Sequence, residues 1–289
     1  MSIPSSKAVA SGRPGDPRPS LLGLVRAGLD DLLTRRRLIG FLVGADLKRT
    51  HADTIIGQLW WVVDPLLQMV VYAVLVGVVF QRSTPDFPLF LFAAILPWKW
   101  FSTTLSDATI SVTNRSSLIR QVPFPKLVLP AAATLAGTVS FAIGLVALGA
   151  VYLFYLHRLS PWLLTLPLVA LVQLVFTFSL AVLFAALNAF YRDVQNVLRH
   201  ALRLWFYVSP TLYSLEQLED HGEIGRVLAL NPMAPILTSY RSIIWGHEGA
   251  ATRAPEWLGL GAVVVLSLVL LAVALAVFKR VEPGFARIL

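Results

Sequence analysis

Residues that could carry out catalysis are few in this sequence, and they are poorly grouped. Two pairs of neighbouring acids, Asp30 with Asp31 and Glu219 with Asp220, could serve acid–base or metal chemistry, but neither pair has the supporting ligands that such a site needs. The chain has no Cys, which excludes disulfides, thiol nucleophiles and Cys-ligated metal. It also has no G-x-x-x-x-G-K-[ST] loop to cradle nucleotide phosphates. We therefore expect no catalytic residue, no metal and no cofactor in this chain.

Lys99 is the charged residue whose position needs an explanation. It lies in the tetrapeptide PWKW, near the middle of an apolar stretch that also contains Asp107. A charge at the centre of an apolar helix is costly to expose to hydrocarbon, so the Lys99 side chain should face a watery cavity or a partner. Asp107 lies nearer the cytoplasmic end of the same stretch, where a charge is less costly than at the centre.

A second unusual stretch is RQVPFPKLVLP, residues 120–130, which places three Pro and two basic residues between apolar segments. Pro123 and Pro125 stop a helix and push the residue before each of them into an extended conformation. The pattern predicts a rigid, positively charged corner.

The elements around these residues belong to a membrane protein. Hydrophobic residues make up 56% of the 289 residues and charged residues only 14%, with a mean hydropathy of +0.71, whereas soluble domains carry about 25% charged residues. The net charge of +8 and the isoelectric point near 10.1 would suggest nucleic acid for a soluble chain. Here the distribution of the basic residues explains both values, and we expect no nucleic-acid partner.

The chain divides into a tail, an amphipathic region and a set of spans. Residues 1–20 are rich in Ser, Pro and Gly, lack a signal-peptide pattern and are expected to be disordered in the cytoplasm. Apolar residues recur every three or four positions from Leu21, which predicts an amphipathic helix lying on the membrane surface; a soluble helix packed on a partner is the alternative. A bilayer core needs about 20 apolar residues. Six stretches meet this requirement: 59–80, 89–112, 127–156, 159–191, 198–215 and 257–278.

The basic residues also predict the orientation. If the N-terminus is cytoplasmic, 18 of the 24 Lys and Arg residues fall on the cytoplasmic side, which is the asymmetry that the positive-inside rule describes. Both termini are then cytoplasmic, and the acidic segment 216–256 lies outside.

Four blocks follow one another along the sequence. They are DLKRTHADTIIGQLWWVVDPL, FPLFLFAAILPWKWFSTTLSDATISVTNRSSLIRQVPFPKLVLP, FYRDVQNVLRHALRLWFYVSPTLYS and NPMAPILTSYRSIIWG. Through these blocks the chain resembles, from about Leu21 to Leu289, the permease subunits of polysaccharide-exporting ABC-2 type transporters, the Wzm-like and teichoic-acid-type permeases. Each block alone is only moderately specific, but their order on a six-span scaffold is much more so.

The resemblance implies a fold and roles for particular residues. The fold is an all-α polytopic permease of the type V exporter class, with cytoplasmic interface and gate helices in residues 21–58, the gate helix being residues 46–58. The loop 113–126 resembles the element that docks on a separate nucleotide-binding subunit. The candidate coupling residues of this loop are Arg115, Leu118, Ile119, Arg120, Phe124, Pro125 and Lys126. Five basic residues would meet a lipid-linked pyrophosphate at the cytoplasmic entrance, which Arg can hold by bidentate hydrogen bonds, or would satisfy anionic lipid instead. These residues are Arg35, Arg36, Arg37, Lys48 and Arg49.

Aromatic residues are candidates for the export pathway, because flat amphipathic rings stack on the apolar faces of sugars. Most aromatic residues of such a protein belong to interfacial belts or helix packing, so only a minority should line the channel. The candidates for channel lining are Trp60, Tyr72, Trp98, Lys99, Trp100, Phe101 and Tyr207. The segment 229–246 has two Pro and an apolar stretch too short to span, so it should be re-entrant. The resemblance makes it an outer lid that includes Asn231, Pro232, Pro235, Tyr240 and Arg241, and a plain surface loop is the alternative.

The resemblance also implies the partners of this chain. If the resemblance holds, ATP and Mg²⁺ bind two copies of a separate ATPase subunit, and two copies of this chain form the conduit in the bacterial inner membrane. The substrate would be a polyprenyl-linked glycan such as O-antigen, teichoic acid or cell-wall galactan. An ABC-2 exporter of a drug, peptide or lipid is the alternative. A secondary transporter or a membrane glycosyltransferase is disfavoured, because paired broken helices and catalytic carboxylates are missing.

Overall fold

The computed structural model describes residues 20–50, 57–75, 86–214, 228, 230–246 and 252–285, and every regular element in these ranges is a helix. The predicted tail 1–20 except Ser20, residues 51–56 of the predicted gate segment and residues 76–80 of the first predicted span lie outside the described residues. The α-helices are α1 (Leu21–Thr34), α2 (Arg36–Thr50), α3 (Trp60–Val74), α4 (Phe87–Ile110), α5 (Ser116–Gln121), α6 (Val128–Tyr152), α7 (Leu166–Phe190), α8 (Val194–Val208), α10 (Met233–Ile244) and α11 (Trp257–Val281). Short 3₁₀ helices are η1 (Gly57–Leu59), η3 (Thr113–Arg115), η4 (Leu153–Arg158), η5 (Pro161–Thr165) and η7 (Glu282–Gly284).

Three stretches within the described residues are long and apolar enough to cross a membrane: Val128–Arg158, Pro161–Phe190 and Trp257–Gly284. They are α6 with η4, η5 with α7, and α11 with η7, and they agree with the predicted spans 127–156, 159–191 and 257–278. The count of six spans stays a prediction.

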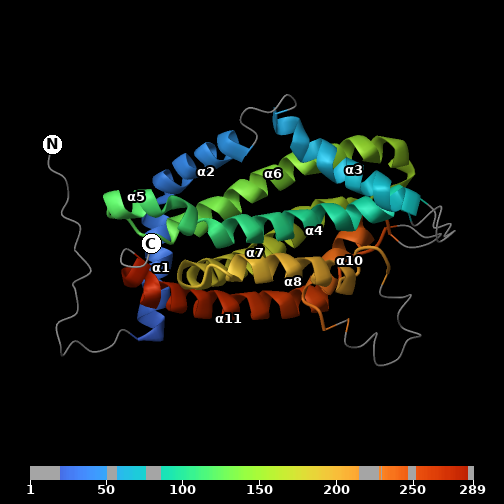
Figure 1. The fold of residues 1–289 in the computed structure, drawn as a ribbon. Coiled ribbons are helices and arrows are strands. Elements are labelled where there is room, and N and C mark those ends of the chain that lie inside the picture. The colour runs from blue at the N-terminus through green and yellow to red at the C-terminus, as the bar shows by residue number, and fades with distance from the viewer. Residues whose placement is uncertain are drawn as a thin grey trace.

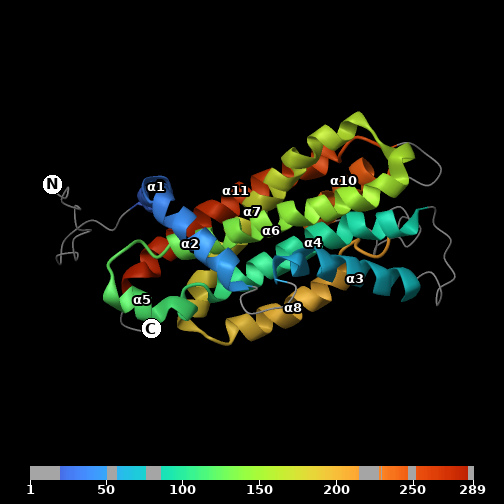
Figure 2. The same ribbon diagram turned by 90° about the horizontal axis from the view of Figure 1, so that it is seen from above.

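The helices α3, α4 and α8 run alongside these three in one elongated bundle (Figures 1 and 2). The 24 residues of α4 give a length of about 36 Å, whereas the 15 residues each of α3 and α8 give about 22 Å. The span expected at 198–215 begins earlier and ends at Val208. Ser209 takes an extended backbone (φ −86°, ψ 149°), because Pro210 follows it.

Close approach between helices depends on Gly at two positions of α6. A Cβ on Gly137 would lie 2.0 Å from Oγ1 of Thr104, and one on Gly144 would lie 2.6 Å from Cδ1 of Leu96. Both contacts are to α4, so the two Gly residues let α6 and α4 pack closely, as small residues do in membrane helix pairs. Buried Ser179 of α7 adds a polar link, since its hydroxyl donates to the carbonyl of Ser267 in α11 at 2.9 Å.

The helix α1 lies at the end of the bundle near α5, and α2 runs from there obliquely over α6 (Figures 1 and 2). Figures 1 and 2 together show α1 crossing the direction of the long helices, the arrangement expected of a helix in the membrane plane. Its N-terminus is capped by Ser20, whose hydroxyl accepts from the Gly23 amide at 3.1 Å. Residues 46–50 of the predicted gate segment 46–58 form the end of α2, and the gate role of this segment stays a prediction.

Candidate functional site

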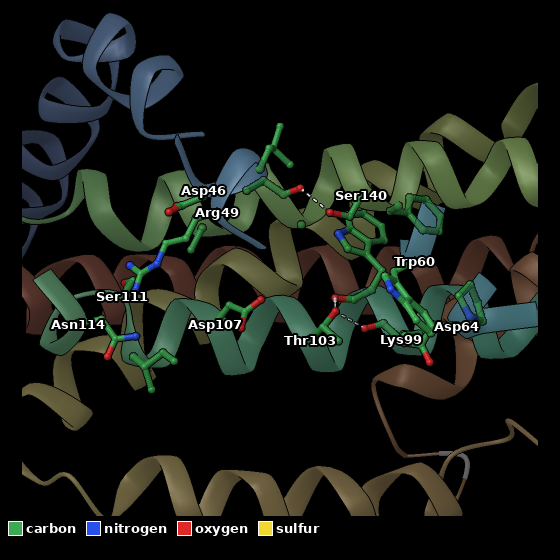
Figure 3. A pocket seen from close by; sticks show the side chains of 18 of the residues that line it. Asp46, Arg49, Trp60, Asp64, Lys99, Thr103, Asp107, Ser111, Asn114 and Ser140 are labelled. Atoms are coloured by element: carbon green, nitrogen blue, oxygen red, sulfur yellow. Dashed lines mark hydrogen bonds and ion pairs between the residues drawn. The ribbon is translucent and has the colours of Figure 1, made fainter. Parts of the chain in front are cut away.

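A pocket with a volume of about 630 Å³ lies between α2, α3, α4 and α6 (Figure 3). Three carboxylates and three basic side chains line it, together with Ser, Thr and Asn side chains and aromatic rings. Asp46 and Arg49 of α2 lie toward one end, Asp64 of α3 and Lys99 of α4 toward the other, and Asp107 between them. The described lining residues are Asp46, Leu47, Arg49, Trp60, Asp64, Pro65, Leu96, Lys99, Trp100, Thr103, Asp107, Ile110, Ser111, Asn114, Arg115, Ala133, Ala136, Gly137, Ser140 and Phe141.

Helical spacing explains how one stripe of α4 provides most of the polar wall. Lys99, Thr103 and Asp107 recur at four-residue intervals and therefore share one face of the helix. The facing side of α6 carries small residues spaced three or four positions apart, namely Ala133, Gly137 and Ser140. Long polar side chains on one helix opposite short side chains on the other leave the pocket open.

Two ion pairs join the walls of the pocket. Lys99 pairs with Asp64, which ties α4 to α3, and Arg115 pairs with Asp46, which ties the segment after α4 to α2. Arg49 and Asp107 form no hydrogen bond or ion pair with any residue that the structure describes. The pocket therefore presents one basic and one acidic side chain to an incoming molecule.

The indole of Trp100 adds a further polar group to the wall. Trp100 is 4% exposed, and its Nε1–H has no hydrogen-bond partner among the described residues. Its ring stacks on that of Phe141 with centroids 4.2 Å apart and an angle of 12° between the planes. The Nε1 atom itself has almost no accessible surface, so this donor stays unsatisfied at a cost of about 1–3 kcal/mol.

The structure separates the basic residues expected at the entrance. Arg49 lines the pocket, and Lys48 is exposed beside it in the last turn of α2. Arg35, Arg36 and Arg37 are exposed at the α1–α2 junction, and Arg49 follows Arg36 by 13 positions, which correspond to about 20 Å of helix. The triplet therefore lies apart from Lys48 and Arg49, and the role of these five residues in binding pyrophosphate stays a prediction.

The predicted coupling loop forms η3, α5 and the Pro-rich corner. The helix α5 ends at Gln121, and Val122 is extended (φ −128°, ψ 128°) before Pro123, which confirms the predicted stop. Arg120 is exposed at the tip, Ile119 is buried, and Leu118, Phe124, Pro125 and Lys126 are half-buried. Val122, which the sequence did not single out, is 47% exposed at this tip.

Side chains that the sequence did not single out hold this corner in place. The Lys126 amide donates to Oε1 of buried Glu282 at 2.5 Å, and Oε2 of Glu282 accepts from Lys279 at 2.6 Å. Lys279 also donates to Asp31 of α1 at 2.5 Å. We call Asp31, Lys279, Glu282 and the Lys126 amide the corner anchor. Its signal in the sequence is weak, since the four residues come from three distant segments.

The aromatic residues predicted to line a channel have different surroundings. Trp60, Lys99 and Trp100 line the pocket, and Trp60 is 37% exposed. Trp98 and Phe101 lie in the core, where Phe101 stacks on Phe176 at 5.8 Å. Tyr72 stacks on Phe206 at 5.6 Å, and Tyr207 is exposed on α8. Which of them lines a channel stays a prediction.

The segment predicted as an outer lid packs at the opposite end of the bundle (Figure 1). The 12 residues of α10 are almost all buried, including Pro235 and Tyr240. Arg241 donates to the carbonyls of Tyr213 (2.8 Å) and Thr211 (3.0 Å). Pro232 is the N-cap of α10.

Asn231 fixes the start of this segment, because its side chain accepts from Trp205 Nε1 at 2.8 Å and donates to Ser209 at 2.8 Å. Nearby, Asp86 sits in the left-handed region (φ 53°) and binds His157 and Arg158. Burial raises the pKa of Asp86, but the hydrogen bonds and charges of His157 and Arg158 outweigh it and hold that pKa below its usual value.

Comparison with known proteins identifies the family. The family model for ABC-2 type transporters matches residues 37–245. This chain belongs to the ABC-2 type transporter family. Its match includes the pocket, the coupling loop and α10, so the ABC-2 family region contains the candidate site.

Similar proteins in this family carry names from polysaccharide export. The O-antigen export system permease protein RfbA of Myxococcus xanthus is 35% identical over 260 residues, which cover 89% of this chain and 96% of that protein. An RfbA of Klebsiella pneumoniae is 26% identical over 253 residues (87% and 95%). The polysialic acid transport protein KpsM of Escherichia coli is 22% identical over 242 residues (79% and 87%).

Proposed function

We propose that this chain is the transmembrane subunit of an ATP-driven exporter that moves a lipid-linked polysaccharide across the bacterial inner membrane. The observation that supports this most strongly is the 35% identity to an O-antigen export permease across 96% of that protein's length. The polar pocket inside an otherwise apolar bundle fits a transported molecule with a polar part.

The mechanism needs a partner to supply energy. We propose that two copies of this chain, with both termini in the cytoplasm, bind two ATPase subunits. ATP and Mg²⁺ would be held by those subunits. The tip of the coupling loop offers the exposed side chains Arg120 and Val122 for this contact, on a corner that Glu282 fixes to the bundle. A fixed corner transmits a displacement that a loose loop would absorb.

Deletion of the gene in the source bacterium tests the transport function. We expect surface glycan to be lost and lipid-linked glycan to accumulate on the cytoplasmic side, measured by immunoblotting and by mass spectrometry of extracted lipids, with restoration by the wild-type gene. Unchanged surface glycan, together with loss of export of a drug, peptide or small lipid, would favour the alternative ABC-2 exporter.

Val122→Asp tests the contact with the ATPase subunit. A charge at this exposed apolar tip should reduce co-purification of the ATPase subunit while the permease still inserts in the membrane. Phe124→Asp is a poorer probe, because Phe124 is half-buried against the core and its replacement also perturbs folding. Val122→Ala and Arg192→Ala, the latter an exposed residue of the α7–α8 turn, are the controls. Normal co-purification of Val122→Asp would argue against docking at this tip.

A further inference from the structure

The pocket holds charged side chains near the middle of α4, where contact with lipid chains would be costly. Lys99 is the thirteenth of the 24 residues of α4, and its side chain is 24% exposed, while that of its partner Asp64 is 59% exposed. An ion pair that remains accessible halfway along a membrane helix must meet water or a polar ligand, since hydrocarbon would cost several kcal/mol. The pocket is thus built for a hydrated or polar occupant.

The charge of the pocket argues against an anionic occupant. Asp64 neutralises Lys99 and Asp46 neutralises Arg115, and Asp107 lies between these pairs. A phosphate or carboxylate entering this space would compete with two carboxylates for their cations and would lie near a third. Arg49 at one end is the basic side chain without a partner among the described residues, and Asp107 offsets its charge.

The remaining groups suit a molecule that carries many hydroxyls. A sugar hydroxyl both donates and accepts, so it can donate to Asp107 and accept from Arg49. The exposed part of the Trp60 ring offers an apolar surface for a sugar face. The small residues of α6 leave about 630 Å³, within the roughly 300–1,000 Å³ typical of pockets for small ligands.

We propose that this pocket binds an uncharged sugar unit of the transported glycan, and that it disfavours acidic sugars. The proposal rests on the proposed function and adds the class of sugar. A pocket of this kind would not suit a polyanion such as polysialic acid, for which the similar protein KpsM is named. The pocket recognises the sugar, while the phosphate of the lipid carrier stays outside, near the exposed Arg35, Arg36 and Arg37 at the α1–α2 junction.

The absence of Cys in the natural sequence permits a direct test. Thr103→Cys places a single thiol in the pocket of the full-length chain in nanodiscs, and a charged, membrane-impermeant methanethiosulfonate measures its accessibility. Val265→Cys, exposed on α11 away from the pocket, is the control that should react slowly because it faces lipid. We expect rapid modification of the Thr103→Cys protein.

Three probes then identify the occupant: delipidated glycan fragments from the source strain, oligosialic acid and inorganic pyrophosphate. Glycan fragments at about ten times their dissociation constant should slow modification of the pocket thiol by about tenfold, whereas the two anions should have no effect. Introducing Trp60→Ala or Asp107→Asn into the Thr103→Cys protein should abolish this protection by glycan fragments.

Several outcomes would overturn the proposal. They are an unreactive pocket thiol, protection by either anion, lack of protection by glycan fragments, and an exported glycan whose repeat unit is acidic. If export of the glycan is intact while fragments give no protection, the pocket proposal fails alone. If the deletion strain still exports its glycan, the proposed function fails instead.

Discussion

At the scale of single residues, the clearest constraint is the missing side chain of Gly137. A Cβ there would lie 2.0 Å from Oγ1 and 3.0 Å from Cβ of Thr104, which is almost fully buried in α4, so α6 would have to move away. We predict that Gly137→Ala destabilises the protein by about 1–3 kcal/mol, as overpacking does. The measurement is the midpoint temperature of the detergent-solubilised protein.

The control for this prediction lies in the same helix. Gly149→Ala meets nothing within 4 Å and should keep or slightly raise the midpoint. Thr104→Ala combined with Gly137→Ala should recover part of the loss, because the closest clash is with the Thr104 hydroxyl. Equal midpoints for Gly137→Ala and Gly149→Ala would mean that α4 and α6 are not in close contact.

The sequence pointed to Lys99 but not to Asp64, the acid with which it pairs. Lys99 was expected to face a cavity or a partner, and the structure gives it both, the pocket and Asp64. Asp64 was not singled out, although it too interrupts an apolar stretch, since a single Asp near the start of a span can also lie at the membrane surface. Only the packing of α3 against α4 shows that the two charges meet.

At the scale of elements, the Pro-rich corner depends on a carboxylate supplied by η7. Glu282→Ala removes the acceptor of the half-buried Lys126 amide and one partner of Lys279, at a cost of about 1 kcal/mol for the lost hydrogen bond to the amide. We predict faster tryptic cleavage at Arg120 and Lys126, measured by mass spectrometry under native conditions.

Glu282→Gln separates the two roles of this carboxylate. The amide oxygen can still accept from Lys126, so cleavage should be intermediate or close to wild type. Glu256→Ala, at the opposite end of α11, should leave the corner unchanged. The corner anchor would be refuted by the same cleavage rate in Glu282→Ala and Glu256→Ala.

At the scale of the whole molecule, Arg115 lies where two parts of the proposed machine meet. It belongs to the predicted coupling loop, lines the pocket and pairs with Asp46 of α2. We predict that Asp46→Arg and Arg115→Asp each reduce glycan export by at least about fivefold, the lower end of typical coupling energies, and that the double exchange restores much of it. Export and glycan-stimulated ATPase activity of the reconstituted complex are the two measurements.

The double exchange is the decisive arm of this experiment. If it is no better than the single variants, the ion pair does not link the coupling loop to α2. If all three variants keep full export, the pair has no part in transport.

The sequence by itself determined the class of protein and most of its helices. Length and apolarity are local properties, so the stretches that became α6, α7 and α11 could be found from composition, and Pro123 and Pro210 set local boundaries through backbone sterics. The tertiary structure decided which charges meet. Asp46 with Arg115, Asp64 with Lys99, and Asp31 with Lys279 join segments between 35 and 248 residues apart, and no local rule relates them. Their pairing depends on which helix faces pack together, and that is fixed by small residues such as Gly137 only when the whole bundle assembles.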